Sequence, residues 1–223
     1  MKKFSLVFGS VLVLSTSAAL AGSFTAPVVE PPVYSPPVSQ AYNWTGGYVG
    51  VGLTYGRGTH SVGGGAPLVA PNSTGPGLGV LMGYNWQNGG MVVGGEVSGV
   101  FSRMNGTNDC GLPPLECESR INNFASARLR LGVAMDNTLL FMTAGYATDV
   151  QRHTISLGGV EVASQARRYN GPVVGVGVEH GFSREWTVRG DLEHYRLGTE
   201  NFFGGVPVTA RTNLARLSIV RRF

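Results

Sequence analysis

The sequence predicts an all-β chain that folds as an eight-stranded antiparallel transmembrane β-barrel, with short turns at one rim and long loops at the other. Three observations predict it. Eight segments of about ten residues alternate between apolar and small or polar side chains, and a tilted strand of that length crosses a bilayer. Charged residues are only 13% of the 223 residues, and 34 residues are glycine. The connections between the segments alternate in length, as they do in membrane-spanning barrels.

The first four predicted strands each carry one apolar face. Tyr48–Gly56 alternates valine, leucine and tyrosine with glycine and threonine, and Gly77–Gln87 alternates leucine, valine, methionine and aromatic residues with small or polar ones. Met91–Arg103 sets methionine, valine and phenylalanine against glycine, glutamate and serine. Ile121–Met135 alternates alanine, leucine and valine with serine, arginine and glycine. A period of two is that of a strand with two different faces.

The last four predicted strands repeat the pattern. Thr138–Val150 alternates leucine, methionine and tyrosine with threonine and glycine, and Val173–Phe182 alternates valine with glycine and glutamate. Trp186–Leu197 places tryptophan, valine and leucine opposite arginine, aspartate and glutamate. Thr212–Phe223 places alanine, leucine and isoleucine opposite arginine and serine. An even number of strands closes a barrel with both chain ends on the same side.

The connections support a membrane barrel. Three are tight turns rich in Asn, Gly, Asp or Ser: Gln87–Gly90, Asp136–Asn137 and Ser183–Arg184. Four are longer and are predicted as loops, near 57–75, 103–120, 149–170 and 197–211.

Aromatic residues gather at both rims, as expected at the two interfaces of a bilayer. The girdle at the short-turn rim is predicted to hold Trp44, Tyr84, Trp86, Phe182, Trp186 and Phe223. Tyr55, Phe101 and Tyr146 lie toward the opposite rim. The alternative is a soluble barrel or sandwich, which would bury the apolar face and expose the charged one. The aromatic rims and the scarcity of charge favour the membrane.

The N-terminal region divides into two parts before the barrel. Residues 1–21 have a basic start, an apolar stretch and a small-residue cleavage motif, which predicts a cleaved signal peptide. Residues 22–42 form a Pro-rich periplasmic linker, and 43–223 form the barrel. Without Lys2 and Lys3 the remaining cations are all arginine and nearly balance the acids, so we expect no nucleic-acid partner.

Cys110 and Cys117 are the two cysteines, and in an exported protein they predict a disulfide within one loop. A metal or redox pair is the alternative, but no His lies nearby and the spacing is not C-x-x-C. His60 and His153 fall in predicted loops, and His180 and His194 fall on the lipid face. No Ser–His–acid grouping is visible, so we expect no enzyme, no cofactor and no metal site.

Several segments resemble the small outer-membrane β-barrel proteins of alphaproteobacteria, distant relatives of the OmpA transmembrane domain. The matching segments are Trp44–Gly50, Gly83–Gln87, Ala127–Gly132, Asn137–Leu140, Gly175–Glu179, Leu192–Tyr195 and Arg222–Phe223. The resemblance implies a place in the outer membrane of a Gram-negative bacterium, a largely structural role and recognition of Phe223 by the barrel-assembly machinery. Members of the family usually carry an aromatic residue two positions before the final Phe, where this sequence has Arg221.

Strand parity sends nine charged side chains into the lumen. They are Glu96, Arg128, Arg130, Glu179, Arg189, Asp191, Glu193, Arg216 and Arg222. An eight-stranded barrel is only wide enough for its side chains to fill it, so we expect an ion-pair network that plugs the lumen. The alternative is that the same charges line a narrow, gated channel.

The predicted function is a monomeric structural barrel that supports the envelope and displays surface loops. Alternatives are a porin-like channel and a surface protein that binds haemin or lipopolysaccharide. Among the arginines at the bases of the loops, Arg167 and Arg168 are candidate contacts for lipopolysaccharide phosphates, with ordinary solvated charge as the alternative.

Overall fold

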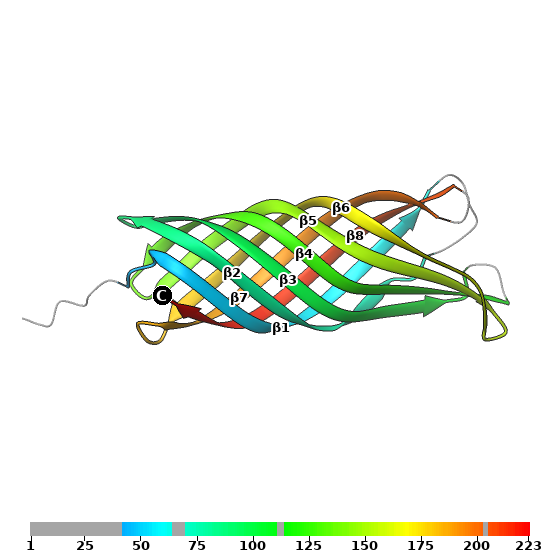
Figure 1. Cartoon of the computed structure of the whole chain (residues 1–223), viewed down its shortest axis with the longest axis horizontal. Helices are drawn as coiled ribbons and strands as arrows, with labels where there is room; N and C mark the ends of the chain where they lie inside the picture. Colours follow the sequence, from blue (N-terminus) through cyan, green and yellow to red (C-terminus); the bar gives the residue numbers. More distant parts are fainter. Residues whose placement is uncertain (1–41, 64–69, 111–113, 203–204) are drawn as a thin grey trace, which may run out of the picture. The chain divides into compact units, whose positions relative to one another are not determined.

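The computed structural model describes residues 42–63, 70–110, 114–202 and 205–223, which form a closed antiparallel barrel (Figure 1). The strands are β1 (Gly46–Val62), β2 (Ser73–Asn88), β3 (Met91–Asn108), β4 (Leu115–Met135), β5 (Thr138–Leu157), β6 (Val160–Gly181), β7 (Trp186–Phe202) and β8 (Val206–Arg222). Each strand pairs with the next, and β1 pairs with β8. The ring is closed over the part nearer the short turns, where β6 pairs with β7 from Val173 to Gly181, so no sheet edge is free there, as a bilayer requires. The predicted fold class is confirmed.

Residues 1–41 are outside the described part of the chain, and with them the predicted signal peptide and nearly all of the Pro-rich linker. In the part that the structure describes, no helix is long and apolar enough to span a bilayer.

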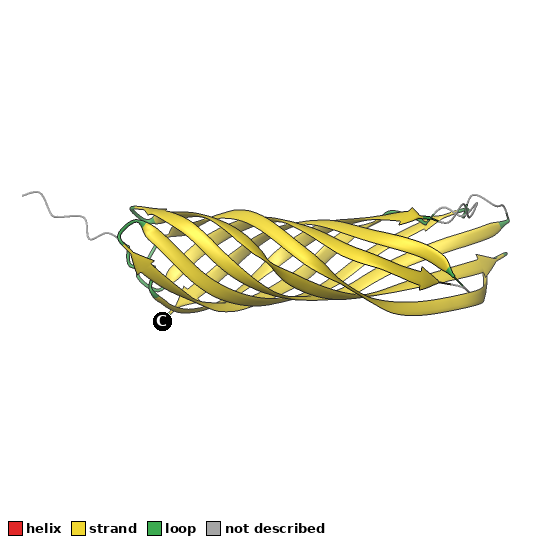
Figure 2. Cartoon of the chain, turned by 90° about the horizontal axis from the view of Figure 1, so that it is seen from above, coloured by secondary structure: helices red, strands yellow, loops and turns green. Residues whose placement is uncertain are grey.

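The barrel has two different ends. The turn end holds the three predicted tight turns, which join β2 to β3, β4 to β5 and β6 to β7. Gly89 and Asp136 take positive φ angles of 58° and 50° there. The other end, called the tip here, holds the remaining four connections. Strands tilt along the whole barrel between the two ends (Figure 2).

The strands continue well past their predicted ends toward the tip. The stretches predicted as loops are mostly strand, so β5 and β6 join through Gly158 and Gly159 alone, at φ angles of 57° and 81°. Two successive positive φ angles define a tight hairpin that glycine adopts without strain. Strands of 16–22 residues exceed the roughly ten that cross a bilayer, so the barrel projects beyond it.

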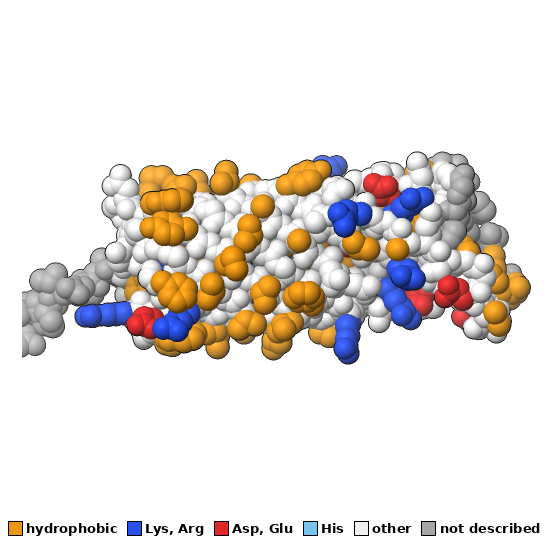
Figure 3. Space-filling view, viewed as in Figure 1, with side chains coloured by type: hydrophobic (Ala, Val, Ile, Leu, Met, Phe, Trp, Pro, Cys, Tyr) orange, Lys and Arg blue, Asp and Glu red, His pale blue; other side chains and the backbone are white. Residues whose placement is uncertain are grey.

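The outer surface carries an apolar belt on the turn-end side. Exposed Val, Leu, Met and aromatic side chains alternate with buried ones along every strand. Beyond the belt, toward the tip, outward side chains become polar, and arginines are prominent (Figure 3). Tyr55, Phe101 and Tyr146 are exposed near this border, and Tyr84, Trp86, Phe182, Trp186 and Phe223 are exposed near the turn end. The belt therefore has aromatic residues at both margins.

The interior is filled by side chains in layers. A charged layer lies behind the apolar belt, with a small apolar cluster of Trp44, Val92, Leu139 and Phe141. A larger apolar cluster follows toward the tip and includes Met104, Ile121, Phe124, Tyr169, Tyr195, Leu197, Phe202 and Val208. The lumen is thus a packed core over much of its length.

Candidate functional site: the barrel lumen

The charged layer contains all nine side chains that strand parity directs inward. Each is buried, with at most 5% of its surface exposed. They come from five strands: β3 (Glu96), β4 (Arg128, Arg130), β6 (Glu179), β7 (Arg189, Asp191, Glu193) and β8 (Arg216, Arg222). The alternation that exposes valine and leucine to lipid on these strands is what turns the charges inward.

Glu96 is the centre of the first group. Its carboxylate accepts hydrogen bonds from Arg128, at 2.5 Å, and from the Arg189 guanidinium. The Tyr48 hydroxyl donates a third, at 2.9 Å. Arg189 also pairs with Asp191 at 2.7 Å, through hydrogen bonds from both Nε and Nη2. These bonds join β1, β3, β4 and β7 across the lumen.

Glu193 forms the second group. It accepts hydrogen bonds from Arg128, from Arg216 at 3.0 Å and from the Tyr195 hydroxyl at 2.5 Å. Arg128 therefore bridges Glu96 and Glu193 and unites the two groups. Bidentate and bridging contacts of this kind suit the planar guanidinium.

Glu179 forms the third group, nearest the turn end. It pairs with Arg130 at 2.5 Å and with Arg222 at 3.5 Å, and it accepts a hydrogen bond from Thr187 at 2.7 Å. The Arg130 guanidinium lies over the Phe141 ring, 3.7 Å from its centroid. The aromatic face adds a favourable contact for a buried cation.

The lumen holds five arginines and four carboxylates among these nine residues, an excess of one cation. Several guanidinium nitrogens of the layer also remain without a hydrogen bond to any described residue. Nη1 of Arg130 and Nη1 of Arg216 are buried and have no hydrogen-bond partner among the described residues. The ion pairs form two sets, one of six residues around Glu96 and Glu193 and one of Glu179, Arg130 and Arg222. The Phe141 ring contacts a guanidinium group of each set, Arg189 and Arg130.

Trp44 corrects the predicted girdle. It is fully buried, not at the lipid interface. The chain enters β1 through Gly46, whose φ of 134° is open to glycine and turns the preceding residues inward. Gln87 accepts a hydrogen bond from the Trp44 backbone amide at 2.7 Å, and Arg222 donates one to its carbonyl. Trp44 therefore covers the turn end of the lumen.

Sequence reasoning missed the neutral partners of the network. Tyr48, Thr187 and Tyr195 donate hydrogen bonds to the buried carboxylates. All three have the inward parity of their strands, so the alternation that located the charges also identifies them. Arg221, by contrast, is exposed beside Trp186 and Phe223 and pairs with Glu185 at 3.5 Å.

The tip brings together residues that the sequence placed in separate loops. Cys110 and Cys117 are joined by a disulfide, which links the end of β3 to the start of β4. His60 on β1 and His153 on β5 face each other inside the barrel, with ring centroids 5.2 Å apart. Arg167 and Arg168 are exposed on β6, in a stretch that pairs with β5 but not with β7.

The histidine pair is poorly arranged for a haem. His60 Nε2 bonds to the Gln151 side chain at 2.8 Å, and His153 is buried against Phe202. The cavity beside His153 has a volume of about 40 Å³, whereas pockets for cofactors measure about 300–1,000 Å³. Within the described ranges, no three His, Cys, Asp or Glu side chains are grouped so as to hold a metal ion.

A closed sheet with an outward apolar belt and a polar, packed interior defines a membrane-spanning β-barrel protein. The outer membrane protein beta-barrel domain model matches residues 16–223, and the chain belongs to that family. The protein therefore lies in the outer membrane of a Gram-negative bacterium, with its turns in the periplasm and its tip outside the cell.

The curated relatives are outer-membrane antigens. The 31 kDa outer-membrane immunogenic proteins of Brucella melitensis biotype 1 and Brucella suis biovar 1 are each 26% identical to this chain over 219 residues. Each comparison covers 88% of this chain and 88% of the relative.

Solved structures share the fold. Neisserial surface protein A has a TM-score of 0.50 and 14% identity, with 80% of this chain and 98% of that chain covered. OprG from Pseudomonas aeruginosa has a TM-score of 0.50 and 10% identity, with 82% and 98% covered.

Proposed function

We propose that this protein is a structural outer-membrane barrel. Its lumen is closed by the ion-pair network, it contributes to envelope integrity, and it displays a projecting tip at the cell surface. The observation that carries this proposal is the layer of buried ion pairs around Glu96, Glu193 and Glu179, with an apolar cluster further toward the tip.

The packing supports a closed lumen more than a channel. An ion that enters must separate pairs whose side chains are almost completely buried. Removing one partner of a buried pair costs about 3–5 kcal/mol, because the other charge is left without compensation. The apolar cluster further toward the tip is a second packed layer that an ion would have to cross.

A deletion strain tests the structural role. Cells without the protein are expected to become sensitive to detergent and to large antibiotics, and expression of the wild-type chain is expected to restore resistance. A variant that removes one lumen charge, Arg216→Gln, alters the lumen and leaves each of the four carboxylates with an arginine partner. Equal rescue by this variant, once it is shown to fold, supports a structural role. Rescue that depends on the lumen charges contradicts it.

We infer further that the chain is not an enzyme. His60 bonds to Gln151 and His194 to Asn213, and these amides cannot act as nucleophiles. His180 bonds to the Thr138 hydroxyl at 2.9 Å on the exposed surface, and no described carboxylate orients it. Turnover of lipid A by the pure protein that is lost in His194→Ala would contradict this inference.

A second role is contact with lipopolysaccharide. Outward-facing arginines stand beyond the belt on seven of the eight strands: Arg57, Arg103, Arg120, Arg152, Arg167, Arg168, Arg196 and Arg211. This is the level at which phosphates of the outer leaflet lie, and guanidinium groups bind phosphate well. Arg167→Gln with Arg168→Gln is expected to lower the amount of lipopolysaccharide that co-purifies with the barrel. If the amount of co-purifying lipopolysaccharide is unchanged, these two arginines do not contact it.

A further inference from the structure

Two pairs of the outward arginines face each other across neighbouring strands, and they differ in their partners. In the first pair, Arg120 on β4 and Arg152 on β5, the Arg120 guanidinium is ion-paired with Glu118 at 2.5 Å. In the second pair, Arg196 on β7 and Arg211 on β8 are direct cross-strand partners, and both are exposed. The Cβ atoms of such partners lie about 5 Å apart, and like charges in this position destabilise the pair. Among the described residues, neither guanidinium forms an ion pair with a carboxylate. The repulsion is relieved if an anion lies between them.

A hollow of about 390 Å³ opens at this pair. Its lining consists of Arg196, Arg211, His194, Pro172 and Val174. His194 is held in place by a hydrogen bond between its Nδ1 and Asn213 Oδ1, at 2.7 Å. One side of the hollow is therefore cationic, and the other is apolar and belongs to the outer surface of β6.

An apolar trough continues from the hollow into the belt. Two further hollows, of about 530 and 610 Å³, follow it along the outside of β6, β7, β8 and β1. The first shares Val174 and His194 with the hollow at the arginines, and the two share Tyr55, Val176, Leu192 and Ala215 with each other. Small residues form the floor: a Cβ added to Gly190 would meet nothing within 4 Å. Most of the outward side chains that line the trough are apolar, as an acyl chain requires.

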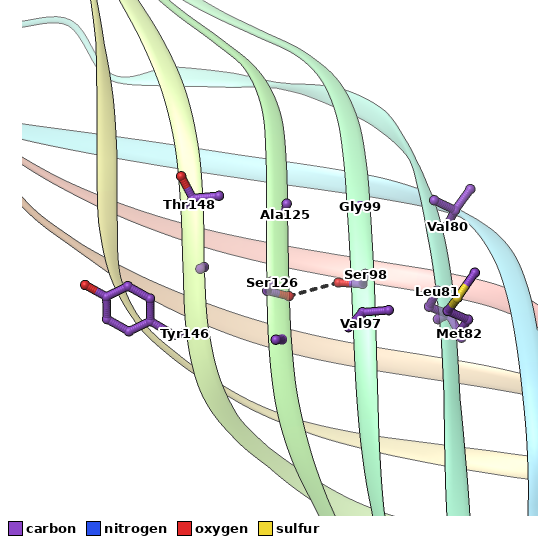
Figure 4. A pocket seen from close by; sticks show the side chains of 12 residues that line it. Val80, Leu81, Met82, Val97, Ser98, Gly99, Ala125, Ser126, Tyr146 and Thr148 are labelled. Carbon is purple, nitrogen blue, oxygen red and sulfur yellow. Dashed lines mark hydrogen bonds between the residues drawn. The ribbon is translucent and has the colours of Figure 1, made fainter.

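The opposite side of the barrel provides a comparison. A hollow of about 540 Å³ lies there over β2–β5, lined by Val80, Met82, Val97, Ala127, Tyr146 and others (Figure 4). Its floor is equally small, with Gly99 and Ala125, and Ser98 bonds to Ser126 beneath it at 3.0 Å. Its lining contains no cation. Among these hollows, only those on the β6–β1 side combine a pair of exposed arginines with an apolar trough.

We propose that a phosphorylated lipid of the outer leaflet, the lipid A part of lipopolysaccharide, is seated on this side of the barrel. One phosphate lies between Arg196 and Arg211, and one acyl chain lies in the trough over Leu192 and Ala215. Because the trough is inside the membrane belt, a soluble anion or a protein loop cannot fill it. This proposal rests on the contact with lipopolysaccharide proposed above. It assigns that contact to one binding site instead of the whole ring of arginines.

Native mass spectrometry of the folded barrel in detergent, with bis-phosphorylated lipid A as the probe, tests the seat. The wild-type protein is expected to retain one lipid A at low excess. Arg196→Gln with Arg211→Gln is expected to weaken retention about tenfold, the effect of losing one charge-assisted contact. Arg103→Gln with Arg152→Gln removes the same charge elsewhere and is expected to leave retention unchanged. The heat-dependent gel shift verifies that each variant is folded.

The trough is tested separately. Ala215→Leu fills it and is expected to weaken retention, whereas Ala127→Leu fills the hollow on the other side and is not. Lipid A without phosphates should bind poorly, and millimolar inorganic phosphate should not displace the lipid.

Three outcomes would contradict this lipid-binding site. Equal losses in both arginine pairs would indicate diffuse charge and leave only the general role of the ring. Competition by inorganic phosphate would indicate a bare anion site. Full retention by the Arg196 and Arg211 variant would exclude the site, and if the Arg167 and Arg168 variant also kept its lipopolysaccharide, the general role would fail as well.

Discussion

Single buried charges decide how firmly this barrel holds together. Glu96 joins Arg128 and Arg189 in a region without solvent, and Tyr48 completes its hydrogen bonds. On the outer surface, Glu185 and Arg221 form a pair of the same chemical type at 3.5 Å, with about half of each side chain or more exposed. The two pairs differ in burial and not in chemistry, so they provide a matched comparison.

Glu96→Gln is expected to destabilise the barrel by about 3–5 kcal/mol, since two buried arginines each lose one of their two carboxylate partners. Glu185→Gln is expected to cost less than about 1 kcal/mol, because water screens the exposed pair. Urea unfolding of the refolded proteins, followed by tryptophan fluorescence and by the gel shift, measures both. Similar losses for the two variants would show that the lumen network does not carry the stability assigned to it.

His153 makes the tip sensitive to acid. It lies past Arg152, outside the membrane belt, and burial, with a smaller contribution from His60, lowers its pKa from 6.5 to about 4. An unfolded chain therefore takes up a proton at a higher pH than the folded tip does. The stability that neutral His153 contributes is complete above pH 6.5 and is lost as the pH falls toward 4.

Hydrogen exchange of the β5 amides beyond Arg152 checks this effect. The intrinsic exchange rate falls between pH 7 and pH 4, and exchange in the wild-type protein is expected to fall less than this, because protection is lost; the difference is an excess over the intrinsic trend. His153→Phe keeps the packing against Phe202 and is expected to remove most of the excess. Other titratable groups, Asp149 and His60 among them, are present in both proteins, so the difference isolates His153. An identical excess in the variant would contradict the assignment.

At the scale of elements, the short segment before β1 is a cover rather than part of the girdle. Trp44 packs on Tyr42, with ring centroids 4.6 Å apart, and on the Arg222 guanidinium, 5.0 Å from its ring centroid. Trp86 and Trp186 point to the lipid interface instead. The three tryptophans therefore report on different environments.

Quenching by brominated lipids distinguishes them. With Trp86→Phe and Trp186→Phe, only Trp44 fluoresces, and its emission is expected to be blue-shifted and barely quenched. With Trp44→Phe, the two remaining residues should be quenched strongly, because their rings reach the interface. Strong quenching of Trp44 would show that its ring lies at the lipid interface, as part of the aromatic girdle.

The belt part of each strand could be predicted because alternation has a simple cause there. Lipid selects apolar side chains outside and the narrow lumen selects small or charged ones inside, which fixes the positions of Arg128 and Glu179 from parity alone. Past the belt the outer face meets water, so the sense of the alternation reverses. Met104 and Ile121 point inward and Arg103 and Arg120 outward. Because of this reversal, the parts of the strands nearest the tip are predicted as loops.

β-Bulges also interrupt the alternation of residues from which the strands are predicted. The pairing register of β4 with β5 shifts between Ile121 and Asn123, and both Asn122 and Asn123 face outward. Ile121 is therefore buried, although strict alternation from Ala125 places it outside. Which carboxylate pairs with which arginine also depends on the tilt of the strands around the ring, and a single sequence does not contain that information.

At the scale of the whole molecule, the barrel combines three environments along one axis. Aromatic residues and Trp44 mark the periplasmic end, the charged network lies behind the lipid belt, and the tip encloses its own apolar core outside the membrane. The tip consists largely of paired strands, with a disulfide across the connection between β3 and β4, and it projects as sheet rather than as a set of loops. Such a surface suits display of fixed epitopes, in keeping with a structural role.

A closed lumen conducts no ions, and single-channel recording from the refolded barrel in a planar bilayer measures this property. Protein that is shown to be folded and inserted should produce no stable current steps, while a porin in the same membranes produces them. The network predicts this silence because ions cannot pass pairs that remain bonded. Reproducible steps in the wild-type protein that change size in Arg128→Gln or Arg130→Gln would contradict the account and make the same charges the lining of a channel.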